Sequence, residues 1–129
     1  ICRELDIKQP VFFAEIRWEK AFNAAKKKRV QFEEISKYPE VRRDLALLLD
    51  NKVSFAQVKE LALNTERKLI KRVNLFDVYQ GKNLGEGKKS YAISFTLQDN
   101  SKTLTDKQID KTMQNLMNNF IKELGAQIR

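Results

Sequence analysis

The pattern of apolar and polar residues predicts alternating strands and helices over residues 36–129. Strands are predicted where residues are apolar throughout or at alternate positions, at 42–50, 69–79, 90–99 and 127–129. Helical periodicity begins after Ser54 and again after Thr105. The order β-α-β-β-α-β is typical of a ferredoxin-like sandwich, an α+β fold in which two helices cover one face of an antiparallel sheet.

Both predicted helices begin with a capping box, in which a Ser or Thr is followed three residues later by Gln. Ser54 precedes Gln57, and Thr105 precedes Gln108. In the second helix, spacings of three and four residues place apolar side chains on one stripe: Ile109, Met113, Leu116, Met117, Phe120, Ile121 and Leu124. We expect this stripe to cover the core rather than to dock a partner helix, and Gly125 to end the helix.

Residues 1–35 are expected to be the end of a larger module that precedes the domain of residues 36–129. The elements expected there are short: a strand over Val11–Trp18, a turn of helix over Trp18–Ala25 and a second strand over 30–35. So few elements cannot bury a core by themselves. The basic run at 26–29 is either a nucleic-acid patch or a solvated connection.

Alternate residues of a strand face opposite sides, which separates a core face from an uncovered face of the predicted sheet. In the strand at 90–99, the apolar parity holds Tyr91, Ile93, Phe95 and Leu97. The other parity is small and mostly polar, and holds Ser90, Ala92, Ser94 and Thr96. The second set suits a face that the helices leave open.

The same parity, applied to the neighbouring strands, sets Phe76 and Val78 opposite Asp77 and Tyr79, and Ile128 opposite Gln127 and Arg129. A stacking ring, groups that hydrogen-bond to base edges and a guanidinium are the parts of a single-stranded RNA site. Any exposed sheet also carries some polar residues without binding RNA. The residues expected on the uncovered face as a candidate RNA site are Asp77, Tyr79, Ser90 and Arg129.

The composition excludes several kinds of catalytic site. The 129 residues include 25 Lys and Arg, 17 Asp and Glu, no His and one Cys, for a formal net charge of +8. Without His there is no Ser or Cys triad that uses His and no His-ligated metal, and one Cys cannot build a zinc cluster. We expect no catalytic residue and no metal site in this chain, and the positive charge favours a polyanion such as RNA, DNA or an acidic protein surface.

The sequence also favours a cytoplasmic location. No apolar run approaches the roughly 20 residues that cross a bilayer, and the first ten residues lack the layout of a signal peptide. A single Cys agrees with a reducing compartment. We therefore expect no membrane partner.

A loop rich in Gly and Lys joins the second and third predicted strands. Five residues separate Gly81 from Gly87 where the phosphate-binding loop of nucleotide-binding proteins has four, and Lys89 follows Lys88 in place of Ser or Thr. This spacing does not fit a nucleotide-binding loop, so we expect a mobile hairpin loop. It is either a plain solvated hairpin or one whose Lys82, Lys88 and Lys89 contact RNA phosphates without reading sequence.

Several stretches, in order and with their spacing, resemble one known family: YPEVRRDLALLLD (38–50), LFDVYQG (75–81), EGKKSYAISFTLQD (86–99), TLTD (103–106) and LGAQIR (124–129). Together they resemble the C-terminal anticodon-binding domain of bacterial phenylalanyl-tRNA synthetase beta subunits over about residues 36–129. The earlier pieces VFFAEIRWEKAF and VQFEEI resemble the end of the catalytic-like module of the same subunit.

The resemblance implies a role in an α2β2 enzyme that uses ATP and magnesium, both on the alpha subunit, to attach phenylalanine to its tRNA. This chain would hold no cofactor, and its implied partners are the anticodon stem-loop of phenylalanine tRNA and the alpha subunit, not DNA. Tyr79 is implied to stack on the first anticodon base, and Asp77 and Ser90 to read its edge, while Arg129 matches a basic position.

Two arginines in the first of these stretches have two possible roles. Arg42 and Arg43 either contact RNA or pair with Asp44 or Asp50 at the strand.

Other functions share the predicted order of elements. A regulatory or scaffolding domain would bind a small molecule or a protein, but amino-acid-sensing modules have a Gly in the turn after the first strand, where this chain has DNKVS (50–54). A general RNA-recognition motif needs an aromatic-rich octamer with Gly, whereas Tyr91, Ile93 and Phe95 are assigned here to the core face.

Overall fold

The computed structural model describes residues 4–7, 11–26, 32 and 35–129, and for Lys82 the backbone only. The chain divides into two units, Ile1–Glu34 and Ile35–Arg129. The second unit holds a sheet of four strands, β1 (Val41–Asp50), β2 (Ile70–Tyr79), β3 (Lys88–Leu97) and β4 (Gln127–Ile128). It also holds the helices α2 (Phe55–Thr65) and α3 (Asp106–Leu124) and the short 3₁₀ helix η1 (Lys82–Leu84).

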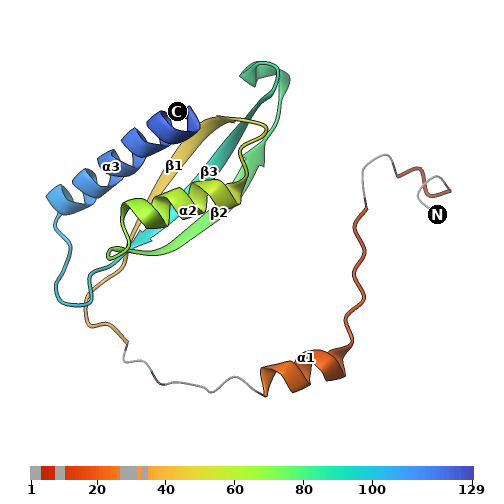
Figure 1. Ribbon diagram of the computed structural model, residues 1–129, viewed down its shortest axis with the longest axis horizontal. Coiled ribbons are helices and arrows are strands. Elements are labelled where there is room, and N and C mark those ends of the chain that lie inside the picture. The colour runs from red at the N-terminus through yellow and green to blue at the C-terminus, as the bar shows by residue number, and fades with distance from the viewer. Residues whose placement is uncertain (1–3, 8–10, 27–31, 33–34) are drawn as a thin grey trace. The chain divides into compact units, whose positions relative to one another are not determined.

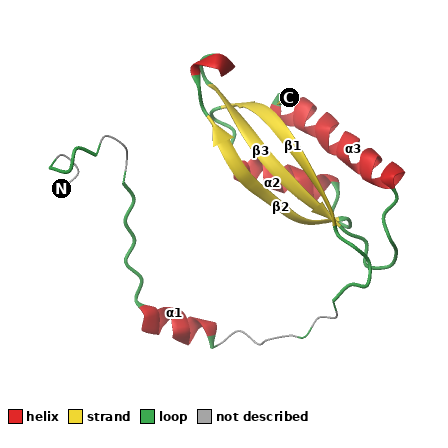
Figure 2. Ribbon diagram, turned by 180° about the vertical axis from the view of Figure 1, so that it is seen from behind, coloured by secondary structure: helices red, strands yellow, loops and turns green. Residues whose placement is uncertain are grey.

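The strand order across the sheet is β2-β3-β1-β4, and each neighbouring pair is antiparallel. Both α2 and α3 lie on one face of the sheet (Figure 1). The view from behind shows the strands in front of α2 and α3, so neither helix covers the other face, the uncovered face of the sheet (Figure 2). This arrangement confirms the predicted ferredoxin-like α+β sandwich.

The helix ends have the chemistry that the sequence predicted. The Ser54 hydroxyl accepts from the Gln57 backbone N–H at 3.4 Å, and the Gln57 side-chain oxygen accepts from the Ser54 N–H at 2.8 Å. Thr105 and Gln108 form the same capping box in α3. Gly125 ends α3 in the left-handed conformation, with φ of 59°, which a residue without Cβ adopts at little cost.

The core lies between the sheet and the two helices. The residues of the apolar parity of β3 are buried, as are most of the apolar stripe of α3 and the facing residues of β1 and α2. Its largest fully buried side chains are Phe95, Phe120, Leu47, Leu49, Ile93, Leu97, Ile109, Leu116 and Val58. Ile121, at the edge of the predicted stripe, stays half exposed. The stripe therefore packs on the sheet of its own chain.

The first unit contains α1 (Trp18–Ala25), where a turn of helix was expected. The predicted strand over Val11–Trp18 is wrong, because residues 11–17 form neither strand nor helix and Trp18 begins α1. A strand needs a hydrogen-bonded neighbour, and no described residue before Val41 belongs to a strand. The predicted strand at 30–35 falls largely outside the described residues.

The basic run at 26–29 also lies outside the described residues, except for Lys26. The ammonium of Lys26 sits 4.6 Å from the centre of the Phe22 ring. None of the helices in the described ranges combines the length with the apolar composition that a membrane-spanning helix needs.

Candidate nucleic-acid interface

Strand register arranges the side chains of the uncovered face in rows. In one row, Tyr79 of β2 is paired with Ser90 of β3, Ser90 with Leu48 of β1, and Leu48 with Gln127 of β4. The row thus crosses all four strands and begins with an aromatic ring at the sheet edge. Its two middle residues are Ser90, with a small hydroxyl side chain, and Leu48.

The next row begins with Asp77, which is paired with Ala92, and Ala92 is paired with Ala46. At the far edge, the Arg129 backbone N–H donates to the Ala46 carbonyl at 3.1 Å. Directly paired residues have Cβ atoms about 5 Å apart, and rows on one face are spaced by two residues, or roughly 7 Å. Ala92 and Ala46 therefore form a low stretch of the sheet surface, the alanine floor, between the Asp77 carboxylate and Arg129.

Three of the predicted site residues come together at one corner of this face. Tyr79 and Asp77 are two positions apart on β2, and Ser90 lies beside Tyr79 on β3. The Tyr79 side chain is 48% exposed, and Asp77 is exposed as well. The corner thus offers a ring face, a carboxylate and a hydroxyl to solvent within one pair of strands.

Arg129 lies on the uncovered face by strand parity but belongs to the opposite edge. It is three strands from Asp77, which at about 4.8 Å per strand is roughly 14 Å. The site expected from sequence is therefore a corner of three residues with a separate guanidinium across the sheet.

The predicted lysines do not share one loop. Lys88 and Lys89 are the first two residues of β3, so the expectation that both lie in a mobile hairpin loop is wrong. Lys89 has the core-face parity and is only 7% exposed. Its ammonium donates to the Asn51 carbonyl at 2.8 Å and lies 4.8 Å from the centre of the Tyr91 ring. Burial removes Lys89 from the candidate RNA surface.

Lys88 has the opposite parity to Lys89, faces the uncovered side and is paired with the exposed Asp50. Lys82 belongs to η1, and its side chain is outside the described residues. Lys88 is therefore the predicted lysine that the structure adds to the uncovered face.

Phe76 was assigned to the side opposite Asp77, and this is wrong. The pairing of β2 with β3 shifts by one residue between Leu75 and Asp77, which marks a β-bulge at Phe76. The ring is 50% exposed, and the Arg42 guanidinium lies 5.5 Å from its centre. The bulge therefore adds an aromatic ring to the uncovered face, which strand parity could not predict.

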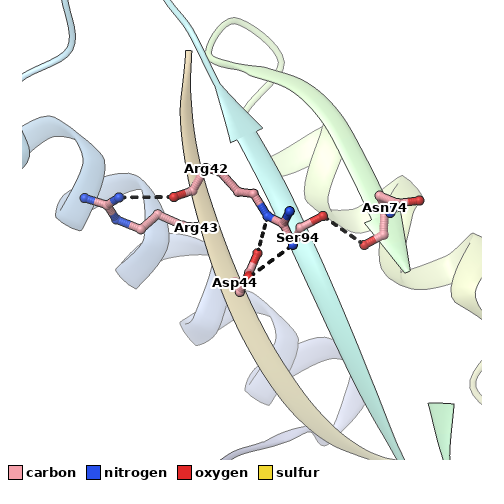
Figure 3. A network of polar contacts seen from close by, with 5 residues as sticks. All are labelled: Arg42, Arg43, Asp44, Asn74 and Ser94. Atoms are coloured by element: carbon pink, nitrogen blue, oxygen red, sulfur yellow. Dashed lines mark hydrogen bonds and ion pairs between the residues drawn. The ribbon is translucent and has the colours of Figure 1, made fainter. Parts of the chain in front are cut away.

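The Arg42 side chain forms an ion pair within its own strand, β1. Its Nε donates to the Asp44 Oδ1 at 2.8 Å and its Nη2 to Oδ2 at 3.2 Å, a two-point ion pair (Figure 3). Arg43 extends to the other side of β1, where its Nη1 donates to the Arg42 carbonyl at 3.1 Å (Figure 3). The structure thus supports the pairing alternative for Arg42, with Asp44 as the partner.

A polar hollow lies near this ion pair, lined by Glu40, Arg42, Arg72, Asn74, Ser94 and Thr96. The Ser94 hydroxyl donates to the Asn74 carbonyl at 3.5 Å (Figure 3). The sequence pattern did not single out this hollow, because the register that sets Arg42 beside Thr96 and Arg72 is fixed by strand pairing and not by spacing along the chain. No group of three or more His, Cys, Asp or Glu side chains among the described residues could hold a metal ion.

The core face agrees with the assignment against an RNA-recognition motif. Tyr91, Ile93 and Phe95 are buried under the helices. Tyr91 makes an edge-to-face contact with Phe55, with ring centres 6.5 Å apart. These rings are therefore unavailable for stacking on bases.

Comparisons with known proteins connect this geometry to one family. Residues 36–129 match the family model of the ferredoxin-fold anticodon binding domain. The phenylalanine–tRNA ligase beta subunit of Bacteroides fragilis is 52% identical over 127 residues, which cover 98% of this chain and 16% of that protein. The beta subunit of Bacteroides thetaiotaomicron is 48% identical over 129 residues, covering 100% of this chain and 16% of that protein.

A more distant relative, the phenylalanine–tRNA ligase beta subunit of Chromobacterium violaceum, is 46% identical over 101 residues, or 78% of this chain and 13% of that protein. The chain thus spans about a sixth of the length of these relatives or less. The family model covers the whole sheet and both helices that pack on it. The match confirms the resemblance found in the sequence, and the chain belongs to the ferredoxin-fold anticodon binding domain family.

Proposed function

We propose that the uncovered face of the sheet binds the anticodon stem-loop of phenylalanine tRNA. One observation carries this proposal: Tyr79, Asp77 and Ser90 occupy one exposed corner of the sheet in a chain of the anticodon binding family. Tyr79 is the stacking residue for the first anticodon base. An aromatic ring accepts any base on its face, so stacking alone contributes affinity with little selectivity.

In this proposal, Asp77 and Ser90 supply the selectivity. A carboxylate accepts hydrogen bonds from base N–H groups, and a hydroxyl donates or accepts. The alanine floor formed by Ala92 and Ala46 supports the proposal, because a flat base can approach the sheet where side chains are short. Polar base edges that meet the wrong partner lose hydrogen bonds, which is the source of discrimination.

Positive charge contributes the general attraction for RNA. Arg129 and Lys88 are the proposed phosphate contacts, since both carry charge on or beside the uncovered face. Lys82 joins them as a residue of the loop next to Tyr79. Such contacts orient the RNA and are sensitive to salt, but they carry no sequence information.

We further propose that the chain works as part of a phenylalanine–tRNA ligase in the cytoplasm, beside an alpha subunit. In that assembly ATP and magnesium belong to the alpha subunit. This chain has no His, and its described residues hold no carboxylate cluster that suits a metal. Its own part in the reaction is therefore to bind and select the tRNA.

The test is a titration of the 129-residue chain with the anticodon stem-loop of phenylalanine tRNA and with stem-loops that differ only in the anticodon. We expect the matching stem-loop to bind most tightly, and each altered first base to weaken binding. Equal affinity for all stem-loops would contradict the proposal, because phosphate attraction alone would then explain the binding.

A further inference from the structure

The ring of Tyr79 lies directly against the backbone of Gly81, two residues further along the chain. A Cβ atom built on Gly81 would lie 2.8 Å from Tyr79 Cε1, and closer still to Cζ and to the hydroxyl oxygen. Cβ atoms in proteins essentially never approach other atoms so closely. The ring therefore fills the space that any side chain at position 81 would need.

Gly81 is needed for room and not for its backbone conformation. Its φ of −147° and ψ of 161° are ordinary extended values, which any residue adopts. Gly85 and Gly87 differ, with φ of 85° and 74° and open space around the position of a Cβ. Gly85 and Gly87 thus provide the positive φ that the turn needs, whereas Gly81 leaves space for the Tyr79 ring.

We propose that Gly81 is a positioning residue for Tyr79, an inference that rests on the proposed stacking role of that ring. The Gly81 backbone lies against the hydroxyl end of the ring, at Oη, Cζ and Cε1, and the half-exposed remainder of the ring is left for a base. A ring that is already held loses less rotational freedom when a base stacks on it. Because Gly81 has no side chain, the Tyr79 ring can occupy its stacking position before RNA binds.

A double-mutant cycle in the 129-residue chain tests this coupling. Gly81→Ala, Tyr79→Ala and the double variant are titrated with the anticodon stem-loop of phenylalanine tRNA. In the presence of the Tyr79 ring, Gly81→Ala should weaken binding by about 2- to 10-fold, the range expected when one ordered side chain is displaced. In the Tyr79→Ala background the same change should have no effect, because there is no ring to displace.

The position of the ring is also measurable without RNA. Ring currents from Tyr79 should shift the NMR signals of the Gly81 α-protons in the unchanged chain, and the shift should vanish in Tyr79→Ala. Unchanged α-proton signals after removal of the ring would overturn the inference even if Gly81→Ala lowers thermal stability.

The cycle separates failure of the inference from failure of the proposed function. A loss for Tyr79→Ala with none for Gly81→Ala would overturn only the positioning role. Equal losses for Gly81→Ala with and without the ring would also overturn it, since Gly81 would then act independently of Tyr79. Unchanged affinity for Tyr79→Ala would overturn the stacking site and the inference together.

Discussion

Tyr79 and Ser90 are cross-strand partners, so the backbone hydrogen bonds of β2 and β3 hold the ring beside the hydroxyl. The loop between them contains η1 and three of the four glycines of the chain. Because strand pairing fixes the two residues, their positions in the sheet do not depend on the loop conformation. A site on rigid elements loses little freedom on binding, which favours affinity.

Asp77 and Ser90 should control selectivity more than affinity. Asp77→Asn keeps the size of the side chain but changes one acceptor into a donor, so preference for the matching first base should fall. Ser90→Ala should reduce the same preference. The measurement is the ratio of affinities for matching and altered stem-loops. A uniform loss for every anticodon would contradict a role in reading the base.

A larger side chain in the alanine floor should leave the stability of the fold nearly unchanged but weaken RNA binding. Ala92→Val suits a strand, since β-branched residues favour extended backbone, and we expect the unfolding temperature to change little. The added methyl groups should obstruct a base that approaches between Asp77 and Ala46, so stem-loop affinity should fall. Unchanged affinity would show that the base does not approach this floor. Ala56→Val, on the exposed side of α2, is a control that should leave RNA binding unchanged.

Substitution of Lys89 should lower the stability of the domain and substitution of Lys88 should not, because the two side chains lie on opposite faces of β3. Lys89→Met keeps the stem but leaves the Asn51 carbonyl without this donor, and should lower the free energy of unfolding by about 1–3 kcal/mol. Lys88→Met should leave stability nearly unchanged. Denaturant unfolding measures both values, and equal losses would contradict the different environments of the two side chains.

The salt dependence of RNA binding tests whether Lys88 contacts a phosphate. If Lys88 contacts one phosphate, Lys88→Met should lower the slope of log affinity against log salt by roughly 0.7, the value for single-stranded nucleic acid. Anticodon preference should remain. An unchanged slope would remove Lys88 from the RNA contacts.

The free energy of unfolding of the domain should depend on pH in part through Asp99. Hydrogen bonds from the Ser101 hydroxyl, at 2.7 Å, and from the Ser101 N–H, at 2.8 Å, hold the pKa of Asp99 below its ordinary value of 3.8. Stabilisation by a carboxylate with a lowered pKa is present above the ordinary pKa and is lost as pH falls through the lowered one. Asp99→Asn should therefore destabilise the domain at pH 6, and the difference should shrink as the pH falls below 3.8. A difference that stays constant over this range would contradict the assignment.

Much of the architecture could be predicted because local signals and the overall fold agree. The capping boxes at Ser54 and Thr105 mark two helix starts, and alternating burial identifies the core face of β3. The same parity predicted the shared face of Asp77, Tyr79 and Ser90. Consistency of this kind across levels makes a sequence informative about its fold.

The errors have definite physical causes. Phe76 was misplaced because a β-bulge inserts one residue into β2, and no Gly or Pro marks it in the sequence. Lys89 was misplaced because β3 begins two residues before the predicted start, which turns a loop residue into a buried one. The room that Tyr79 needs at Gly81 depends on a contact between side chain and backbone, which residue spacing does not reveal.

The most direct test of the central claim is a cycle that removes the ring from the protein and the base from the RNA. The stem-loop of phenylalanine tRNA is prepared with its first anticodon nucleotide intact or abasic, and each form is titrated with the 129-residue chain and with Tyr79→Ala. We expect either removal alone to weaken binding by about 1–3 kcal/mol, and the second removal to add almost nothing. Tyr79→Phe should bind nearly as well as the unchanged chain. Losses that simply add would contradict stacking between Tyr79 and the first anticodon base.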